Sequence, residues 1–291
     1  MLFNQLSVYK IESIPEINPS EFEALLGQKP FAPTLSQQVE SLGWQPLMHQ
    51  SRSWAVDQAV LLQMRREQRN VPPAVIRDLA DQRFAEQQHR PSRDELRQMK
   101  EAILLELLPQ AFPTHQDSLM LIDHKHQQLW VDQSSEKRVS QVTGLLRETI
   151  EQYGGLKIVP LFGSEPLNAL LSSWLLNGPP AGFELGDSAK LIDPREGGQI
   201  TVSRLGLPDD NVLAHLRDGL SADQLELVYQ DQIRFTLKSD GHLTKIKVLT
   251  EADDIPDMDS DDPAVRFDAD LRLMTAQLRG LIHALKTAMA E

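Results

Sequence analysis

The chain of 291 residues contains no cysteine. This absence excludes a disulfide framework, a thiolate nucleophile and any zinc site built on cysteine, and it fits a reducing cytoplasm. No apolar run approaches the length of about 20 residues that crosses a bilayer. The N-terminus also lacks a basic segment followed by an apolar run. We therefore expect no signal peptide, no membrane partner and a cytoplasmic location.

The chain also lacks the short motifs that mark common catalytic and nucleotide-binding sites. None of the patterns GxxxxGKS/T, GxGxxG and GxSxG occurs, so no motif supports a phosphate-binding loop, a dinucleotide site or a nucleophile elbow. A catalytic site assembled from distant residues would leave no such motif. Such an enzyme stays open as a minor hypothesis, and we expect no enzymatic activity and no cofactor.

Two groups of residues resemble metal ligands by their spacing alone. His124 and His126 lie between aspartates, but the lysine and glutamines around them make an exposed polar turn the better interpretation. Residues 257–261 alternate aspartate with other residues, as at the start of a calcium loop. The sixth position of that loop holds Asp262, where the geometry needs glycine. We expect no metal at either place.

The charge is strongly acidic in total and unevenly distributed. The formal net charge is −13, which taken alone argues against nucleic acid as a partner. Residues 65–100 nevertheless carry nine positive and six negative side chains, whereas residues 251–263 carry seven acids and no base. A basic surface can therefore exist within an acidic protein. The simpler interpretation of 70–108 is an exposed helical pair with mixed charges on its solvated face.

Apolar periodicity predicts an α+β protein whose subdomains share one packed body, because no low-complexity linker interrupts it. The clearest helix covers 262–285, behind an Asp262–Pro263 start. Its single apolar stripe consists of Phe267, Leu271, Met274, Leu278, Leu281 and Leu285. Further expected helices span 18–27 with Ser20 as the cap, 74–89, 92–108 with a Ser92–Glu95 capping box, 136–153, 164–178, 209–218 and 221–227. Expected strands span 2–12, 53–66, 156–162 and 199–204, with hairpins at 118–132 and 233–249.

The four tryptophans could in principle stack on nucleic-acid bases. They are scattered along the chain, and each lies in an apolar context. We therefore expect core packing for Trp44, Trp54, Trp130 and Trp174.

Several strings of the chain occur in the order and spacing of a known family. The clearest is RFDADLRLMTAQL at 266–278. The others are MLFNQLSVYKI (1–11), SLGWQPL (41–47), QMRREQRNVPPAVI (63–76), LLPQAF (107–112), LMLID (119–123), IVPL (158–161) and the pair Gly197-Gly198. As an ordered set, these strings resemble the RdgC proteins, a bacterial recombination-associated family that binds DNA without catalysis.

The resemblance implies a horseshoe-shaped monomer of several α+β subdomains, with β-sheets and packed helices, that closes into a ring as a homodimer. Duplex DNA would pass through the ring regardless of sequence, with single-stranded DNA as a second candidate partner. The protein would restrain RecA-dependent recombination and associate with the nucleoid. The implied regions are a central α/β body (1–70, 113–163 and 229–291), a helical base region (71–112) and a tip region (164–228).

The resemblance also identifies candidate DNA-binding residues. Three arginines match the basic end of a family strand and are the first expected phosphate contacts: Arg65, Arg66 and Arg69. A second group lies in the family's basic helical region, where the local match is looser: Arg93, Arg97 and Lys100. Because these contacts would go to phosphates, we expect binding that does not depend on sequence.

Two positions are implied in dimer contacts, and several basic positions of the family are missing. Phe112 matches an aromatic residue where subunits meet, and Arg204 matches a basic residue on the outer tip near a second contact. Gln110 stands where the family has arginine, and only one base occurs near 204. Lys245 and Lys247, which share one strand face, are candidates to replace the lost charge.

A hypothesis of a different class uses the acidic surface instead of a basic one. The protein would then contact the recombination machinery directly, without DNA. This hypothesis predicts a complex with the recombinase in the absence of nucleic acid, whereas the DNA-binding hypothesis predicts an effect that follows DNA occupancy.

Overall fold

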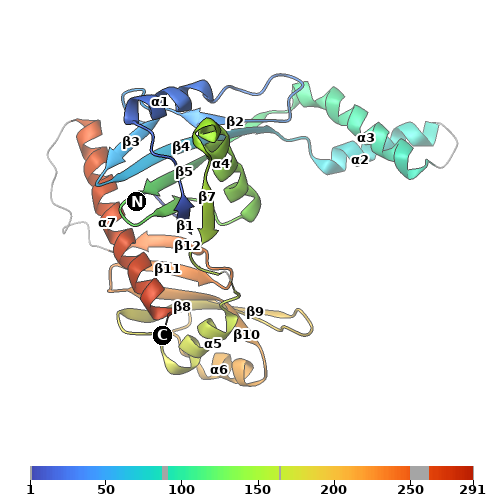
Figure 1. Ribbon diagram of the computed structural model, residues 1–291. Coiled ribbons are helices and arrows are strands. Elements are labelled where there is room, and N and C mark those ends of the chain that lie inside the picture. The colour runs from blue at the N-terminus through green and yellow to red at the C-terminus, as the bar shows by residue number, and fades with distance from the viewer. Residues whose placement is uncertain (1, 87–90, 164, 250–261, 291) are drawn as a thin grey trace.

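The computed structural model describes residues 2–86, 91–163, 165–249 and 262–290. It confirms the predicted α+β class, with seven α-helices in these ranges and two antiparallel sheets. Figure 1 shows the two sheets one above the other, with a helical arm projecting from the upper half and a strand hairpin projecting to the same side from the lower half. The outline is therefore open on one side, like a horseshoe.

The upper, N-terminal sheet has the strand order β2-β4-β5-β6-β1-β7, with β3 paired to β4. Its strands are β1 (Ser7–Ser13), β2 (Glu40–Gln45), β3 (Ser53–Val56), β4 (Ala59–Arg69), β5 (Pro113–Asp123), β6 (Gln128–Val131) and β7 (Lys157–Pro160). The long pair β4–β5 runs in unbroken register from Ala59 opposite Asp123 to Arg69 opposite Pro113. This pair carries the sheet outward to the base of the arm (Figure 1).

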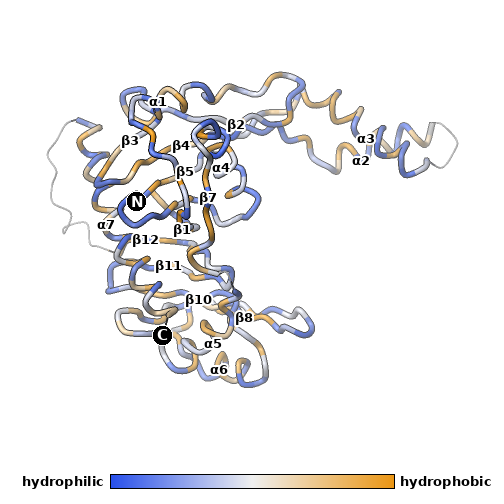
Figure 2. Tube along the Cα trace, in the orientation of Figure 1, coloured by the Kyte–Doolittle hydropathy of each residue, from blue (hydrophilic) through white to orange (hydrophobic). Residues whose placement is uncertain are grey.

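Helices cover both faces of the N-terminal sheet. On one face, Leu62 and Met64 join a core with α1 (Pro19–Gln28) and α4 (Glu136–Thr149). On the other face, Leu61 and Leu121 join the core that contains α7 (Pro263–Ala288). Neighbouring residues on a strand point to opposite faces, so the apolar runs of β4 and β5 supply both cores. Figure 2 shows hydrophobic residues along these strands.

The lower, C-terminal sheet has the strand order β12-β11-β10-β8-β9. Its strands are β8 (Phe183–Ile192), β9 (Gln199–Val202), β10 (Ser221–Tyr229), β11 (Ile233–Lys238) and β12 (Leu243–Val248). Its apolar face packs on α5 (Asn168–Asn177), α6 (Asp210–Arg217) and the second half of α7. Because α7 contributes to the core over both sheets, it ties the two halves together (Figure 1).

Backbone contacts also join the two sheets directly. Leu6 and Leu243 exchange N–H···O bonds of 2.8 and 3.0 Å. Nearby, Gly163 and Gly241 both have positive φ, and a Cβ atom on Gly163 would lie 2.2 Å from the Asp240 carbonyl oxygen. Only glycine fits this approach of two backbones. The junction is therefore tightly packed.

A half-buried carboxylate at this junction, that of Asp132, gives a testable pH dependence. Burial raises the pKa of Asp132 from 3.8 to about 6, although the Gln5 N–H donates to the carboxylate at 3.2 Å. The folded protein therefore loses stability relative to the unfolded chain as pH rises from about 4 to 6. We expect Asp132→Asn, which keeps an acceptor oxygen, to raise the free energy of unfolding by about 1 kcal/mol at pH 7, after allowance for solvent screening. In thermal unfolding, the Tm of this variant should exceed that of the parent by about 2–4 °C at pH 7, and the difference should disappear below about pH 4. An equal gain at both pH values would contradict this assignment.

The C-terminal helix is confirmed, including its start. The Asp262 side chain accepts from the Ala264 N–H, Pro263 is the first helical residue, and the apolar stripe is buried except for the half-buried Phe267. Polar contacts add to this docking. Arg279 donates to both carboxylate oxygens of the fully buried Asp123 at 2.8 and 2.9 Å. The Trp54 indole N–H donates to Asp268 at 3.0 Å.

The other local predictions have mixed outcomes. The Ser92–Glu95 capping box and both hairpins are confirmed. The cap of α1 is Asn18, not Ser20, because Pro19 occupies the first helical position. The expected single strand 53–66 is two strands, joined by a two-residue turn at Asp57-Gln58 with φ of 44° and 61°. The expected helix 221–227 is strand β10.

The prediction that the tryptophans pack in the core is confirmed, with three of them buried and Trp54 packed against the core. Trp44, Trp130 and Trp174 are buried in the cores. Trp54 is half-buried beneath α7, where its ring lies 5.6 Å from that of Phe267 in an edge-to-face arrangement. No described helix is both long and apolar enough to cross a membrane. The calcium-like residues 257–261 lie outside the described ranges.

Candidate nucleic-acid interface

Helices α2 (Pro73–Glu86) and α3 (Arg93–Leu107) form the arm that projects away from both sheets (Figure 1). The capping box fixes where α3 begins, and Pro73 is the first residue of α2, directly after Pro72. The arm has a small core of its own, in which Ala80 and Ile103 are fully buried. Figure 2 shows hydrophilic and hydrophobic residues interleaved along both helices. The arm therefore exposes much of its surface.

Three of the predicted basic residues lie together on the arm. Arg93, Arg97 and Lys100 are spaced by four and three residues, which places them on one side of α3. They border a groove of about 500 Å³ between α2 and α3. Among the described residues, Arg97 has a weak contact of 3.3 Å with Asp94, and neither Arg93 nor Lys100 has an ion-pair partner. Arg93 and Lys100 are therefore free to meet phosphates, whereas Arg97 would have to exchange its contact with Asp94 for one.

The three strand arginines are not brought together in this way. Arg65 forms a two-pronged ion pair with Asp117 on β5, with N–O distances of 2.6 and 2.7 Å. Arg66 points to the opposite face, where its guanidinium donates to Glu40. Both charges are compensated within the sheet. The hydrogen bonds from Arg65 hold the pKa of Asp117 below its usual value, so the pair stays ionised at neutral pH.

Arg69 has a structural role at the base of the arm. Its guanidinium donates to the carbonyl oxygen of Ala111 at 2.8 Å and to that of Thr34 at 3.4 Å. These bonds hold together two loops whose next residues, Leu35 and Phe112, are 74% and 88% exposed. An apolar patch therefore lies where the arm leaves the sheet. Gln110 occupies the short helix just before it, Leu108–Gln110.

The remaining predicted cations belong to the lower half of the molecule. Arg204 is exposed on the loop between β9 and α6, with a φ of 57°. Lys245 and Lys247 are exposed on β12, on either side of the buried Ile246. Their separation from the α3 group means that no single compact site contains all nine predicted residues.

Two features of the arm were missed by the sequence interpretation. The floor of the α2–α3 groove is apolar and is formed by Pro73, Ile76, Leu96 and Leu104. The exposed Leu35 was not singled out either. Apolar residues at every third or fourth position of the two helices indicate an apolar face. The periodicity does not show whether such a face is covered by other parts of the protein or lines an open groove.

Of the two histidines considered as metal ligands, His126 has a side-chain partner and His124 is exposed. The His126 ring nitrogen Nδ1 lies 2.9 Å from the Asp123 carboxylate, and His124 lies in the β5–β6 turn. In the described part of the chain, no group of three or more histidine, aspartate or glutamate residues could hold a metal ion.

Comparison with known proteins decides the family. A family model described as "Putative exonuclease, RdgC" matches residues 1–291, the whole chain. The chain belongs to the RdgC family. Recombination-associated protein RdgC of Serratia proteamaculans is 33% identical over 292 residues, covering 96% of this chain and 95% of the relative. That of Psychromonas ingrahamii is 33% identical over 300 residues, covering 99% and 98%. That of Salmonella paratyphi B is 31% identical over 293 residues, covering 97% and 96%.

The names within the RdgC family differ in what they state. The family description includes the word exonuclease, whereas these three relatives are each named for an association with recombination. The family resemblance proposed from the sequence is thus confirmed over the full length. The names of the three relatives share a link to recombination and do not state an enzymatic activity.

Proposed function

We propose that this RdgC-family chain is a non-catalytic protein that binds DNA regardless of sequence and restrains RecA-dependent recombination by occupying DNA. The observation that supports this most is the group Arg93, Arg97 and Lys100 on one side of α3. These cations, of which only Arg97 has a carboxylate partner among the described residues, stand on an arm that projects from a protein of net charge −13. Local potential, not total charge, determines where phosphates bind.

The arrangement suits phosphate recognition better than base recognition. Arg93 and Lys100 are seven residues apart, which is about 10 Å along a helix, so the group can contact more than one phosphate. Such contacts release condensed counterions from DNA and carry no sequence information. Arg204, Lys245 and Lys247 would add charge from the lower half, and the open outline leaves space between the two groups (Figure 1).

The same chain offers a surface for a second copy. Leu35, Leu105 and Phe112 are 74%, 55% and 88% exposed at or near the base of the arm. Apolar groups of this size at the surface commonly mark protein contacts. In the proposed homodimer, two such arms meet and two open outlines close into a ring around the duplex. Enclosure would add to affinity without base contacts.

Fluorescence anisotropy with two duplexes of unrelated sequence, measured over a salt series, tests the DNA-binding part of the proposal. We expect equal affinities that fall steeply with salt. Absence of binding at low salt would refute it. The same duplexes incubated with Mg²⁺ and run on a denaturing gel should stay intact, and their shortening would support the exonuclease description instead. Tighter retention on closed circular than on linear DNA would support the ring.

The proposed dimer contact gives its own prediction. Phe112→Ala removes an exposed aromatic ring, so we expect no change in folding and a loss of about 2 kcal/mol from association, or about a 30-fold higher dimer Kd. Sedimentation velocity over a concentration series measures this shift. The matched control is Val265→Ala, which truncates a 47% exposed side chain on α7. If both variants dimerise as the parent does, Phe112 is not in the interface.

The acidic net charge favours a second candidate function, which is direct binding to another protein. A net charge of −13 suits direct contact with a basic protein surface. The chain would then regulate the recombination machinery without DNA. A pull-down of RecA by this chain after nuclease treatment distinguishes the two functions, because only the direct contact survives the removal of DNA.

A further inference from the structure

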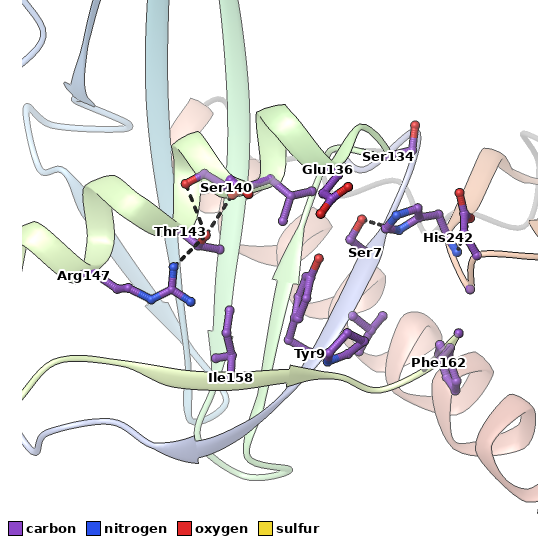
Figure 3. Close-up of a pocket in the computed structure, with 16 residues that line it drawn as sticks. Ser7, Tyr9, Ser134, Glu136, Ser140, Thr143, Arg147, Ile158, Phe162 and His242 are labelled. Carbon is purple, nitrogen blue, oxygen red and sulfur yellow. Dashed lines mark hydrogen bonds between the residues drawn. The ribbon is translucent and has the colours of Figure 1, made fainter. Parts of the chain in front are cut away.

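A pocket of about 430 Å³ lies at the junction of the two sheets, and none of the candidate DNA-binding residues lines it. Its walls come from α4, from β1 and β7, and from the turn between β11 and β12 (Figure 3). Its size falls within the range of roughly 300–1,000 Å³ that is typical of small-molecule sites.

Helix α4 presents a row of polar side chains to this pocket. Glu136, Ser140, Thr143 and Arg147 are spaced by four, three and four residues, so they follow one side of the helix, and all four line the pocket. Figure 3 shows Arg147 at one end of the row and Glu136 at the other. The two ends of the pocket therefore carry opposite charge.

The Arg147 end is suited to an anion. The guanidinium makes only long hydrogen bonds, at 3.5 Å to the Thr143 hydroxyl and at 3.4 Å to the Leu156 carbonyl oxygen. In the described part of the chain it has no carboxylate partner within 4.0 Å. An arginine without such a partner can bind a phosphate through two parallel N–H···O bonds.

The opposite end is suited to hydrogen-bond donors. Ser7 donates its only hydroxyl proton to the Gln133 carbonyl oxygen. The Nδ1 atom of His242 lies 2.7 Å from the Ser7 oxygen, so in this second hydrogen bond His242 is the donor and Ser7 the acceptor. Burial lowers the pKa of His242, which keeps the ring neutral at pH 7. The carboxylate of Glu136 has no partner among the described residues and accepts only.

The space between the two ends combines apolar walls with one free donor. Ile158, Pro160 and Phe162 supply apolar atoms from the side of β7, and Val139 supplies them from α4. The Tyr9 hydroxyl lies between these walls (Figure 3) and has no hydrogen-bond partner among the described residues. Burial and the nearby Glu136 raise the pKa of Tyr9, so the hydroxyl stays protonated and can donate.

We propose that this pocket binds a nucleoside monophosphate, with its phosphate at Arg147 and the amino edge of its base toward Glu136. The phosphate of such a ligand would meet Arg147, and its flat base would lie against the apolar walls. The hydrogen-bond donors on the edge of the base would face Glu136. Because the walls belong to both sheets, the bound ligand stabilises the junction between the arm-bearing half and the lower half. This inference stands apart from DNA binding by the arm.

Isothermal titration calorimetry with AMP, GMP, CMP and UMP tests the proposal. We expect at least one nucleotide to bind with a Kd below about 1 mM and to raise Tm. Arg147→Gln should weaken that nucleotide about tenfold or more and leave the weaker binding of its phosphate-free nucleoside unchanged. Arg138→Gln is the matched control, because Arg138 is an exposed arginine of α4 that does not line the pocket.

Three results would overturn the inference. The first is no detectable binding of any of the four nucleotides at millimolar concentration by the parent protein, whose fold is intact. The second is binding that Arg147→Gln and Arg138→Gln leave equally tight. The third is displacement of the nucleotide by a short duplex at concentrations that saturate DNA binding, which would make the pocket part of the DNA surface. Glu136→Gln should alter the order of preference among the four bases, and an unchanged order would place the base elsewhere.

Discussion

Reversing two charges on α3 is expected to lower the affinity for duplex DNA about 100-fold at moderate salt. In the variant Arg93→Glu with Arg97→Glu, two cations of α3 become anions next to the phosphates; Arg97 has only an exposed contact with Asp94. Each lost contact should reduce the slope of log K against log salt by about 0.9, so the slope falls by about 1.8. The loss should be equal for unrelated sequences, because the lost contacts carry no base information. Anisotropy over the salt series measures both quantities.

A matched double reversal on another surface controls for the change in total charge. Arg266→Glu with Lys286→Glu alters the net charge by the same amount, on exposed residues of α7. Figure 1 shows α7 on the side of the molecule opposite the arm. This control should bind DNA within a few-fold of the parent. Equal loss in both variants would show that only the total charge matters, and retention in both would remove α3 from the DNA surface.

The strand arginines would behave differently in the same experiment. Reversal of Arg65 places a glutamate opposite Asp117, and reversal of Arg66 places one near Glu40, the present partner of its guanidinium. Both changes introduce repulsion within the sheet as well as removing positive charge. Any loss of DNA binding in such a variant must therefore be compared with its unfolding temperature before it is attributed to lost phosphate contacts.

The sequence predicted the elements whose pattern is local. The stripe of α7, the Asp262 and Ser92 caps and the hairpins depend on residues close together in the chain. Strand β10 was misassigned because the segment 221–227 is short and its polar residues, such as Glu226, obscure the alternation. Pairing with β8 and β11 on either side, which the sequence does not show, fixes it as a strand.

The candidate site was predictable only in part, for the same reason. The spacing of Arg93, Arg97 and Lys100 within one helix already places them together. The compensation of Arg65 depends on Asp117, which is 52 residues away and meets it through the register of β4 and β5. The exposure of Phe112 could not be derived from composition, because a phenylalanine is most often buried. Only the family resemblance assigned it a surface role.

The ion pairs in the structure show which positive charges are compensated by carboxylates. Three arginines on the sheets have carboxylate partners, in the pairs Arg65–Asp117, Arg66–Glu40 and Arg234–Glu226. The α3 cations border a groove that contains Glu101 as its only acid. On the arm, Arg77, Arg83 and Arg97 are also paired, with Asp78, Glu106 and Asp94. Among the described residues, Arg93 and Lys100 have no such partner, and the DNA-binding proposal depends most on these two charges.

Removal of the Arg279 side chain is expected to destabilise the protein by about 3 kcal/mol or more, which corresponds to a fall of roughly 6–10 °C in Tm. Arg279 donates to both oxygens of Asp123, whose side chain is fully buried, and also to the Asp57 carbonyl oxygen at 2.9 Å. In Arg279→Ala, a buried carboxylate loses its only arginine partner and keeps the His126 ring and the backbone N–H groups of Lys125 and His126. Because α7 spans both sheets, the loss should affect the whole molecule.

The pH dependence and two further variants test this explanation. Burial tends to raise the pKa of Asp123, but the hydrogen bonds from Arg279 and His126 outweigh it and hold the pKa below its usual value. The stability that the Asp123–Arg279 pair contributes is therefore present at neutral pH and is lost as pH falls through that low pKa. The difference in free energy of unfolding between the parent and Arg279→Ala should accordingly become smaller in acid.

Asp123→Asn with Arg279→Met should recover most of the lost stability, since the amide oxygen can still accept from the Lys125 N–H. Arg272→Ala, which breaks pairs that are about half exposed, should change stability by less than about 1 kcal/mol. If Arg272→Ala and Arg279→Ala prove equally destabilising in thermal unfolding, burial of Asp123 is not the cause.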